Sequence, residues 1–112
     1  MGFTSRMQFG TRQSFSSASL TGTYQALGNP ISHAASILKI VNGGTTDIDV
    51  SIDGSTNHDV VPASGFVLYD VSSDNPVSNP VFIPNNTQVY VKGTAGTGTI
   101  YLVHLYVEQS GQ

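Results

Sequence analysis

The sequence predicts an all-β protein: a single antiparallel β-sandwich or jelly-roll-like domain of about seven to eight short strands. Between Asp47 and Asp53, the apolar residues Ile48, Val50 and Ile52 alternate with polar ones. This period of two places the apolar side chains on one face of a strand. Turn-forming residues recur roughly every eight to twelve positions, which is typical of sandwiches. No helix of useful length is encoded.

The first strands are expected after a polar N-terminal segment. Residues 15–20 and 23–27 carry β-forming residues and are separated by Thr21-Gly22. A turn is expected at Gly28-Asn29-Pro30, because proline fixes its own φ and has no N–H to donate. Residues 32–36 are expected to form a loop.

A hairpin is expected in the middle of the chain, with strands at 37–41 and 47–53 joined by Asn42-Gly43-Gly44. The Asn-Gly pair is a strong hairpin signal because both residues accept a positive φ. Strand 37–41 is apolar on both sides, which predicts a central, well-covered position. Strand 47–53 is expected at an edge, where its carboxylates would discourage pairing with another chain.

The remaining strands are expected at 59–61, 65–71, 81–83, 87–92 and 99–107, with a surface loop at 72–79. Strands 87–92 and 99–107 are predicted to pair through the glycine-rich connection 93–98. Both alternate sets of residues in the last strand are apolar or aromatic. It is therefore also expected to be central and covered on both sides.

Residues 1–14 differ from the rest and are interpreted as an extended N-terminal arm, followed by the domain at 15–108 and a C-terminal tail at 109–112. The alternative interpretation is a frayed terminus without a role. We favour the arm, because isolated Phe, Met and Arg are the residue types that anchor interfaces. The candidate assembly interface consists of Phe3, Arg6, Met7, Phe9, Arg12 and Phe15.

Composition narrows the possible functions. Only 10% of the residues are charged, against roughly 25% in an average soluble domain. The formal net charge is −3 with four basic residues, so the Lys and Arg cluster that nucleic acid requires is missing. The absence of Cys excludes disulfides and thiolate metal sites. We expect no membrane segment and no secretory signal, because no apolar run is long enough. A surface of Thr, Ser, Asn and Gly suits packing against proteins, although an ordinary β domain could also carry it.

No catalytic arrangement is evident, so we expect neither an enzyme nor a cofactor. Asp49, Ser51, Asp53 and Gly54 copy the first half of a calcium loop, but the twelfth position is Val60 instead of a bidentate carboxylate. The three histidines are far apart in sequence and do not predict a metal site. The sequence also lacks the G-x-S-x-G elbow of many hydrolases.

Three stretches resemble a group of small virion proteins from tailed bacteriophages: TYQALGNPISHAASILKIVNGGTTDIDVSIDG, HDVVPASGFVLYDV and PNNTQVYVKGTAGTGTIYLVHLY. Together they span most of the chain from Tyr24 to Tyr106, and residues 1–14 lie outside them. The resemblance implies a structural component of the particle, at the head–tail neck or on the capsid surface. It supplies no catalytic residues.

Three functions follow as hypotheses. The favoured one is a collar or neck subunit that forms a homo-oligomeric ring or lattice and contacts portal, adaptor, tail or major capsid protein. The second is a capsid decoration or cement protein. The third is a carbohydrate- or receptor-binding module, which the five tyrosines could serve, although tryptophan is absent. For the first two we expect a virion location, with assembly in the host bacterial cytoplasm and without nucleic-acid or membrane partners.

Overall fold

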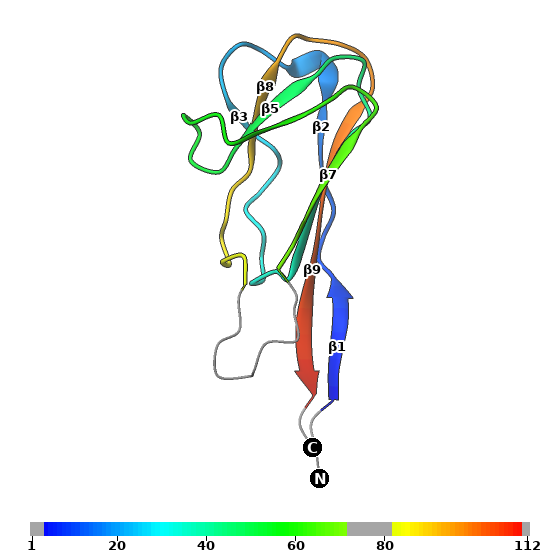
Figure 1. The fold of residues 1–112 in the computed structure, drawn as a ribbon, viewed down its shortest axis with the longest axis vertical. Helices are drawn as coiled ribbons and strands as arrows, with labels where there is room; N and C mark the ends of the chain where they lie inside the picture. Colours follow the sequence, from blue (N-terminus) through cyan, green and yellow to red (C-terminus); the bar gives the residue numbers. More distant parts are fainter. Residues whose placement is uncertain (1–3, 72–81, 111–112) are drawn as a thin grey trace.

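The computed structural model describes residues 4–71 and 82–110, and the side chains within 7–71 and 82–107. Two antiparallel sheets pack against each other as a β-sandwich (Figure 1). The only helical element in these ranges is the 3-10 turn Ser17–Ser19, so no helix of the described chain is long and apolar enough to cross a membrane. The predicted all-β sandwich is confirmed.

The first sheet has the order β1-β9-β4-β7, with β2 also paired to β9. Its strands are β1 (Thr4–Phe9), β2 (Gln13–Ser16), β4 (Ile37–Asn42), β7 (Phe66–Asp70) and β9 (Thr99–Ser110). β4 and β9 lie in the interior of this sheet, which confirms the central positions predicted for them. β1 and β2 run end to end along the same side of β9.

The second sheet has the order β3-β8-β5-β6. Its strands are β3 (Gln25–Ala26), β5 (Ile48–Ser51), β6 (Asp59–Val61) and β8 (Tyr90–Gly93). Beyond β3, the chain continues beside residues 83–89 through backbone hydrogen bonds from the N–H groups of Leu27, Ile31 and Ala35. Residues 32–36, predicted to form a loop, therefore include an isolated bridge between Ala35 and Ile83.

The core lies between the two sheets and is built from side chains that alternate inward along each strand. Partly buried Phe15, Val67, Tyr69 and Ile83 pack against it. Its buried apolar members are Leu20, Leu27, Ile31, Ala35, Leu38, Ile40, Ile48, Val50, Val61, Val89, Val91, Ile100 and Leu102.

Both predicted hairpins are wrong, because β4 and β5 belong to different sheets and so do β8 and β9. The side chain of Asn42 explains why the chain crosses from β4 in the first sheet to β5 in the second. Its buried side chain accepts a hydrogen bond from the N–H of Gly44 at 3.0 Å. Its amide group donates to the carbonyl oxygens of Thr46, Val61 and Pro62 at 2.8, 3.1 and 3.2 Å. The side chain thus fixes the connection between β4 and β5 to the end of β6, and the chain does not form the hairpin that was expected at Asn42-Gly43-Gly44.

The expected edge position of residues 47–53 is also wrong. β5 lies between β8 and β6, and the strand ends at Ser51. Ile48 and Val50 face the core as predicted, but Ile52 is 57% exposed. The reason is a turn: the Ser51 hydroxyl donates to the Asp53 carboxylate at 2.8 Å and accepts the N–H of Gly54 at 3.0 Å, so the strand alternation stops before Ile52.

Residues 4–9 of the predicted arm form β1 against the chain's own β9. Pairing between β4 and β9 ends at Ile37 and Leu105, and beyond this point β9 is paired with β1, as at Met7 and Val107. This two-stranded ribbon extends past the second sheet (Figure 1), in a molecule with principal extents of 53 × 23 × 21 Å. An isolated two-stranded ribbon is only marginally stable in water, so the ribbon is the least supported part of the first sheet.

Candidate interaction surface

The most unusual surface of the molecule is the outer face of the first sheet. Residues paired across an antiparallel sheet lie on the same face, so the strand register defines this surface. Its rows run from β7 across β4 and β9 to β1. We call it the apolar face; its members are Phe66, Leu68, Ile37, Val41, Tyr101, Val103, Leu105, Val107, Met7 and Phe9, with Lys39 among them.

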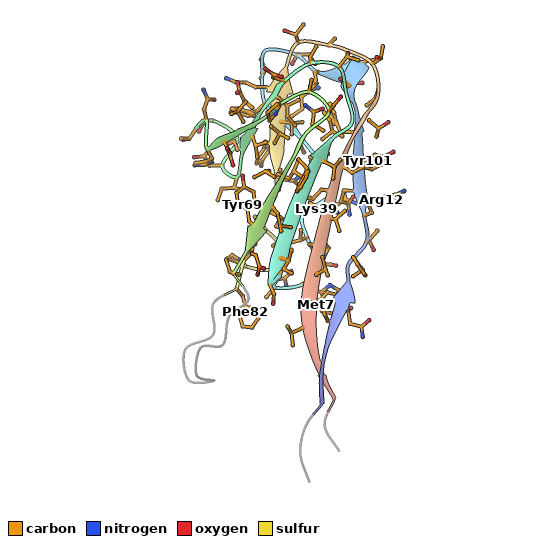
Figure 2. All side chains as sticks on the ribbon, turned by 45° about the vertical axis from the view of Figure 1, so that its right-hand side comes forward. Met7, Arg12, Lys39, Tyr69, Phe82 and Tyr101 are labelled. Atoms are coloured by element: carbon orange, nitrogen blue, oxygen red, sulfur yellow. The ribbon has the colours of Figure 1, made fainter. Side chains whose placement is uncertain are left out.

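Within the described residues, no further layer covers the apolar face (Figures 1 and 2). Phe9 is 73% exposed, Phe66 65% and Leu68 49%. An antiparallel sheet with one solvated side normally places polar residues there. The prediction that β4 and β9 are covered on both sides is therefore wrong for the single chain. Their inner sides are buried, and their outer sides are apolar and open.

Two cations lie on this apolar face. Lys39 is half-buried on β4 and lies between Leu68 of β7 and Val103 of β9. The guanidinium of Arg12 lies 4.9 Å from the centroid of the Tyr101 ring (Figure 2). Asp70 lies at the β7 edge of the same face, in register with Ile37, which belongs to the apolar face.

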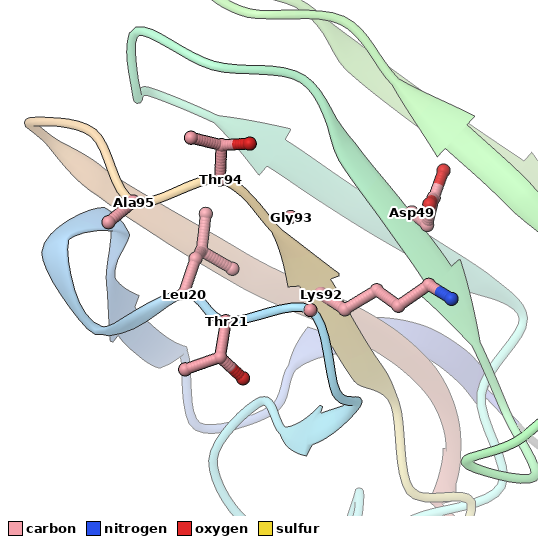
Figure 3. A pocket seen from close by; sticks show the side chains of 8 residues that line it. Leu20, Thr21, Asp49, Lys92, Gly93, Thr94 and Ala95 are labelled. Carbon is pink, nitrogen blue, oxygen red and sulfur yellow. The ribbon is translucent and has the colours of Figure 1, made fainter.

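The outer face of the second sheet is polar by contrast. Across β6, β5 and β8, Val60, Asp49 and Lys92 are in register, and the Lys92 ammonium lies 4.7 Å from the Tyr24 ring centroid. Partial desolvation, followed by the charges of Asp49 and Asp53, raises the pKa of Tyr24. A shallow hollow of about 440 Å³ opens beside this row (Figure 3); it is lined by Leu20, Thr21, Gly22, Asp49, Lys92, Gly93, Thr94 and Ala95.

The stretch that copies half a calcium loop forms the end of β5 and the turn after it. The Asp53 carboxylate accepts the backbone N–H groups of Thr56 and Ser55, both at 2.8 Å. These bonds, with side-chain hydrogen bonds from Thr56 and Ser51, hold the pKa of Asp53 well below its usual range. Asp53 is therefore a fixed negative charge at the end of the second sheet.

An apolar cavity of about 470 Å³ opens between the sheets, next to β6 and β7. Leu38, Val50 and Ile83 contribute to its wall. The hydroxyl of Tyr69 donates a hydrogen bond to the Asp59 carboxylate at this cavity. Burial in the first place, and then Asp59, raises the pKa of Tyr69, while the same hydrogen bond lowers the pKa of Asp59. The pair joins β6 of the second sheet to β7 of the first with a charge-assisted bond.

Two of the three histidines meet at the start of the ribbon, which the sequence did not predict. The rings of His33 and Tyr106 stack with their centroids 3.7 Å apart and an interplanar angle of 6°. The centroid of the His104 ring lies 6.1 Å from that of His33. His104 is buried, and within the described part of the chain neither ring nitrogen has a hydrogen-bond partner. Burial, followed by the nearby His33, lowers the pKa of His104. His58 lies elsewhere, where its Nδ1 accepts the N–H of Ile52 at 3.1 Å.

In the described side chains, no three His, Asp or Glu residues converge to form a metal-binding group. The tyrosines do not gather on one surface either. Tyr69 faces the space between the sheets and Tyr106 stacks on a histidine. The other three are divided between the outer faces of the two sheets, with Tyr101 on the first and Tyr24 and Tyr90 on the second.

The predicted interface residues fall into different places. Met7 and Phe9 lie on the apolar face, and Arg12 lies beside it over Tyr101. Arg6 is opposite Glu108 in the ribbon, but its side chain is outside the described part. Phe3 also lies outside the described residues.

Phe15 departs from the predicted interface, because it packs against the core. The cause is a bulge between β1 and β2. Phe9 is opposite Leu105 and Gln13 is opposite Leu102. The N-terminal segment therefore advances by four residues while β9 advances by three. An extra residue of this kind reverses which side chains face inward.

Sequence reasoning missed Phe66 and Leu68. The signal was present in FVLYD, where two large apolar residues alternate with Val67 and Tyr69, which pack on the core.

Comparison with known proteins did not assign a family: no protein-family model matches the sequence, and no curated protein matches it.

Proposed function

We propose that this chain is a structural subunit of a tailed-bacteriophage virion, acting at the collar or neck by packing its apolar face against protein. The observation that carries the proposal is the open apolar face on the first sheet. Support for the phage context comes from the sequence resemblance between Tyr24 and Tyr106. The alternative location is the capsid surface, where the same face would hold a decoration protein.

The energetics favour burial of the apolar face. Complete burial of a large apolar side chain stabilises by about 1.5–3 kcal/mol. Phe9, Phe66 and Leu68 are already partly covered, so docking of these three recovers on the order of 3–6 kcal/mol in total. This gain is modest against the entropy lost on association. It becomes effective when many copies are held together in one particle, because each contact then forms at a high effective concentration.

The proposal is tested in phage particles that lack the chain and are complemented with plasmid-encoded variants. Leu68→Asp places a carboxylate on the apolar face, and Ile52→Asp is the matched control at an exposed position outside it. We expect the wild-type chain and Ile52→Asp to co-purify with particles and Leu68→Asp to be lost from them. Equal incorporation of both variants, or particles without the wild-type chain, contradicts the proposal.

Subunit counting in the same particles separates the two locations. A small fixed number of copies at one vertex supports the collar, and many copies spread over the shell support decoration. Binding of the isolated domain to a glycan array, together with absence from the particle, would instead favour the carbohydrate-binding alternative.

A further inference from the structure

We infer that copies of this chain associate head to tail, with the apolar face of one copy packed on the outer face of the second sheet of the next. The inference depends on the proposed function in one respect: the assembled form would be the ring of a collar. It names a second copy as the occupant of the apolar face. The argument comes from the distribution of charge over the two faces.

Lys39 argues against the simplest alternative, a symmetric contact between two apolar faces. It lies within the face, flanked by Leu68 and Val103. A two-fold contact pairs each patch with its own copy. If it buried the whole apolar face, it would bring the two Lys39 ammonium groups close together in a desolvated interface. Like charges placed this way oppose association.

The second sheet offers the opposite charge. Three of the five aspartates with described side chains, Asp47, Asp49 and Asp53, lie on β5 or directly beside it, and Lys92 is the single cation of this sheet. Lys92 is in register with Asp49, and its ammonium lies over the Tyr24 ring, so Asp47 and Asp53 carry the excess negative charge of this face. Asp49 lies on the outer face of β5, and Asp47 and Asp53 flank that strand. Exposed Val60 beside Asp49 adds apolar contact. An acidic face with an apolar spot complements an apolar face that carries Lys39 and Arg12 and has the single carboxylate of Asp70 at its β7 edge.

The size of the apolar face determines how strong one contact can be. The apolar face consists of four rows of side chains across about four strands. From the spacing of residues and strands in a sheet, it measures roughly 25 Å along the strands and 15 Å across them, on the order of 400 Å². A standard protein interface buries about 800 Å² on each partner. A single head-to-tail contact is therefore weak and requires concentrated protein. Because a head-to-tail contact leaves one face of each kind unused, further copies add until a ring closes or a filament grows.

Sedimentation velocity of the purified full chain over a wide concentration range tests the inference. We expect wild-type protein to form reversible species larger than dimers that dissociate at high salt. Lys39→Glu and Asp49→Lys should each remain monomeric, and the double variant K39E/D49K should associate again, because the two charges are exchanged. Ser19→Glu, an exposed position on the 3-10 turn, is the control for a change in net charge and should behave as wild type.

Lys39→Met separates the two symmetries without introducing a new charge. It should weaken a head-to-tail contact and strengthen a two-fold contact between apolar faces. Far-UV circular dichroism and thermal melting of each variant exclude misfolding as the cause. A wild-type chain that is monomeric throughout, a double variant that fails to associate, or tighter association of Lys39→Met overturns the inference.

The inference and the proposed function fail in different experiments. If the wild-type chain is monomeric in solution but enters particles through Leu68, the partner is another protein and the virion role stands. If the chain assembles in solution but particles lack it, the head-to-tail contact stands and the virion role is wrong.

Discussion

Replacement of Asn42 by leucine tests the crossing that makes this chain a sandwich. Leucine has a similar size but removes every hydrogen bond that the Asn42 side chain makes. These bonds join the start of the connection after β4, at Gly44 and Thr46, to the end of β6 at Val61 and Pro62. The substitution therefore loosens two connections between the sheets at once.

The expected loss can be worked out bond by bond. The N–H of Gly44 is buried and would be left without the acceptor that Asn42 supplies, which costs about 1–3 kcal/mol. The amide group has two protons for three carbonyl oxygens, so at most two strong bonds are lost there, at about 0.5–1.5 kcal/mol each. The sum is about 2–6 kcal/mol. A small domain has a total stability of about 5–15 kcal/mol, so the variant should be severely destabilised.

Urea unfolding measures this loss. The chain contains five tyrosines and no tryptophan, so tyrosine fluorescence and far-UV circular dichroism are the suitable signals. We expect a lower midpoint with an unchanged slope. Asn85→Ala, at an exposed turn position, is the control and should change the free energy of unfolding by less than about 0.5 kcal/mol. A loss below about 1 kcal/mol for Asn42→Leu would show that these hydrogen bonds do not hold the crossing.

Three further predictions concern single side chains. Val50→Asp should unfold the domain and Ile52→Asp should leave it stable, because Val50 is buried and Ile52 is exposed; similar melting curves for the two variants would refute the assigned facing. The pKa of His104 is lowered by burial from the model-compound value of 6.5, so its contribution to stability is complete above pH 6.5 and is lost as the pH falls toward the folded-state pKa. His104→Leu should flatten this slope in urea titrations across that range, and an unchanged slope would exclude His104 as its source. Tyr69→Phe removes the hydrogen bond to Asp59 and should cost about 1 kcal/mol in the same assay; a neutral result would mean that water replaces the phenol.

The alternation of residues predicted the inward-facing positions of β5 correctly. Ile48 and Val50 face inward as their spacing indicates. The pairing of strands was not predictable in the same way. Asn42 and the glycines after it form a strong local hairpin signal, but the Asn42 side chain bonds to Val61 and Pro62, 19 and 20 residues away. A non-local contact of this kind overrides a local turn preference, and it cannot be read from neighbouring residues.

The N-terminal segment shows a second limit of pattern reading. Met7 and Phe9 face outward, whereas Gln13 and Phe15, also at odd positions, share the inner side with their partners on β9. The bulge near Gly10 reverses the alternation. The N–H of Gly10 bonds to the carbonyl of His104 at 2.8 Å, and a side chain at this position would overlap the His104 ring. The apolar residues of the N-terminal segment lack a regular period, which suggested an arm. The reason is that β1 and β2 are two strands whose inward-facing positions differ by one residue.

The composition of β4 and β9 links the fold to the proposed assembly. Both strands are apolar on both sides, a pattern that belongs to strands covered by a layer above and a layer below. The chain's own second sheet covers their inner side, and the described residues supply no layer for Ile37, Val41, Val103 and Leu105 on the other. A solvated outer face would be expected to carry polar residues at these positions, as Asp49 and Lys92 do on the second sheet. This composition supports the proposal that another protein chain supplies the missing layer by packing on the apolar face.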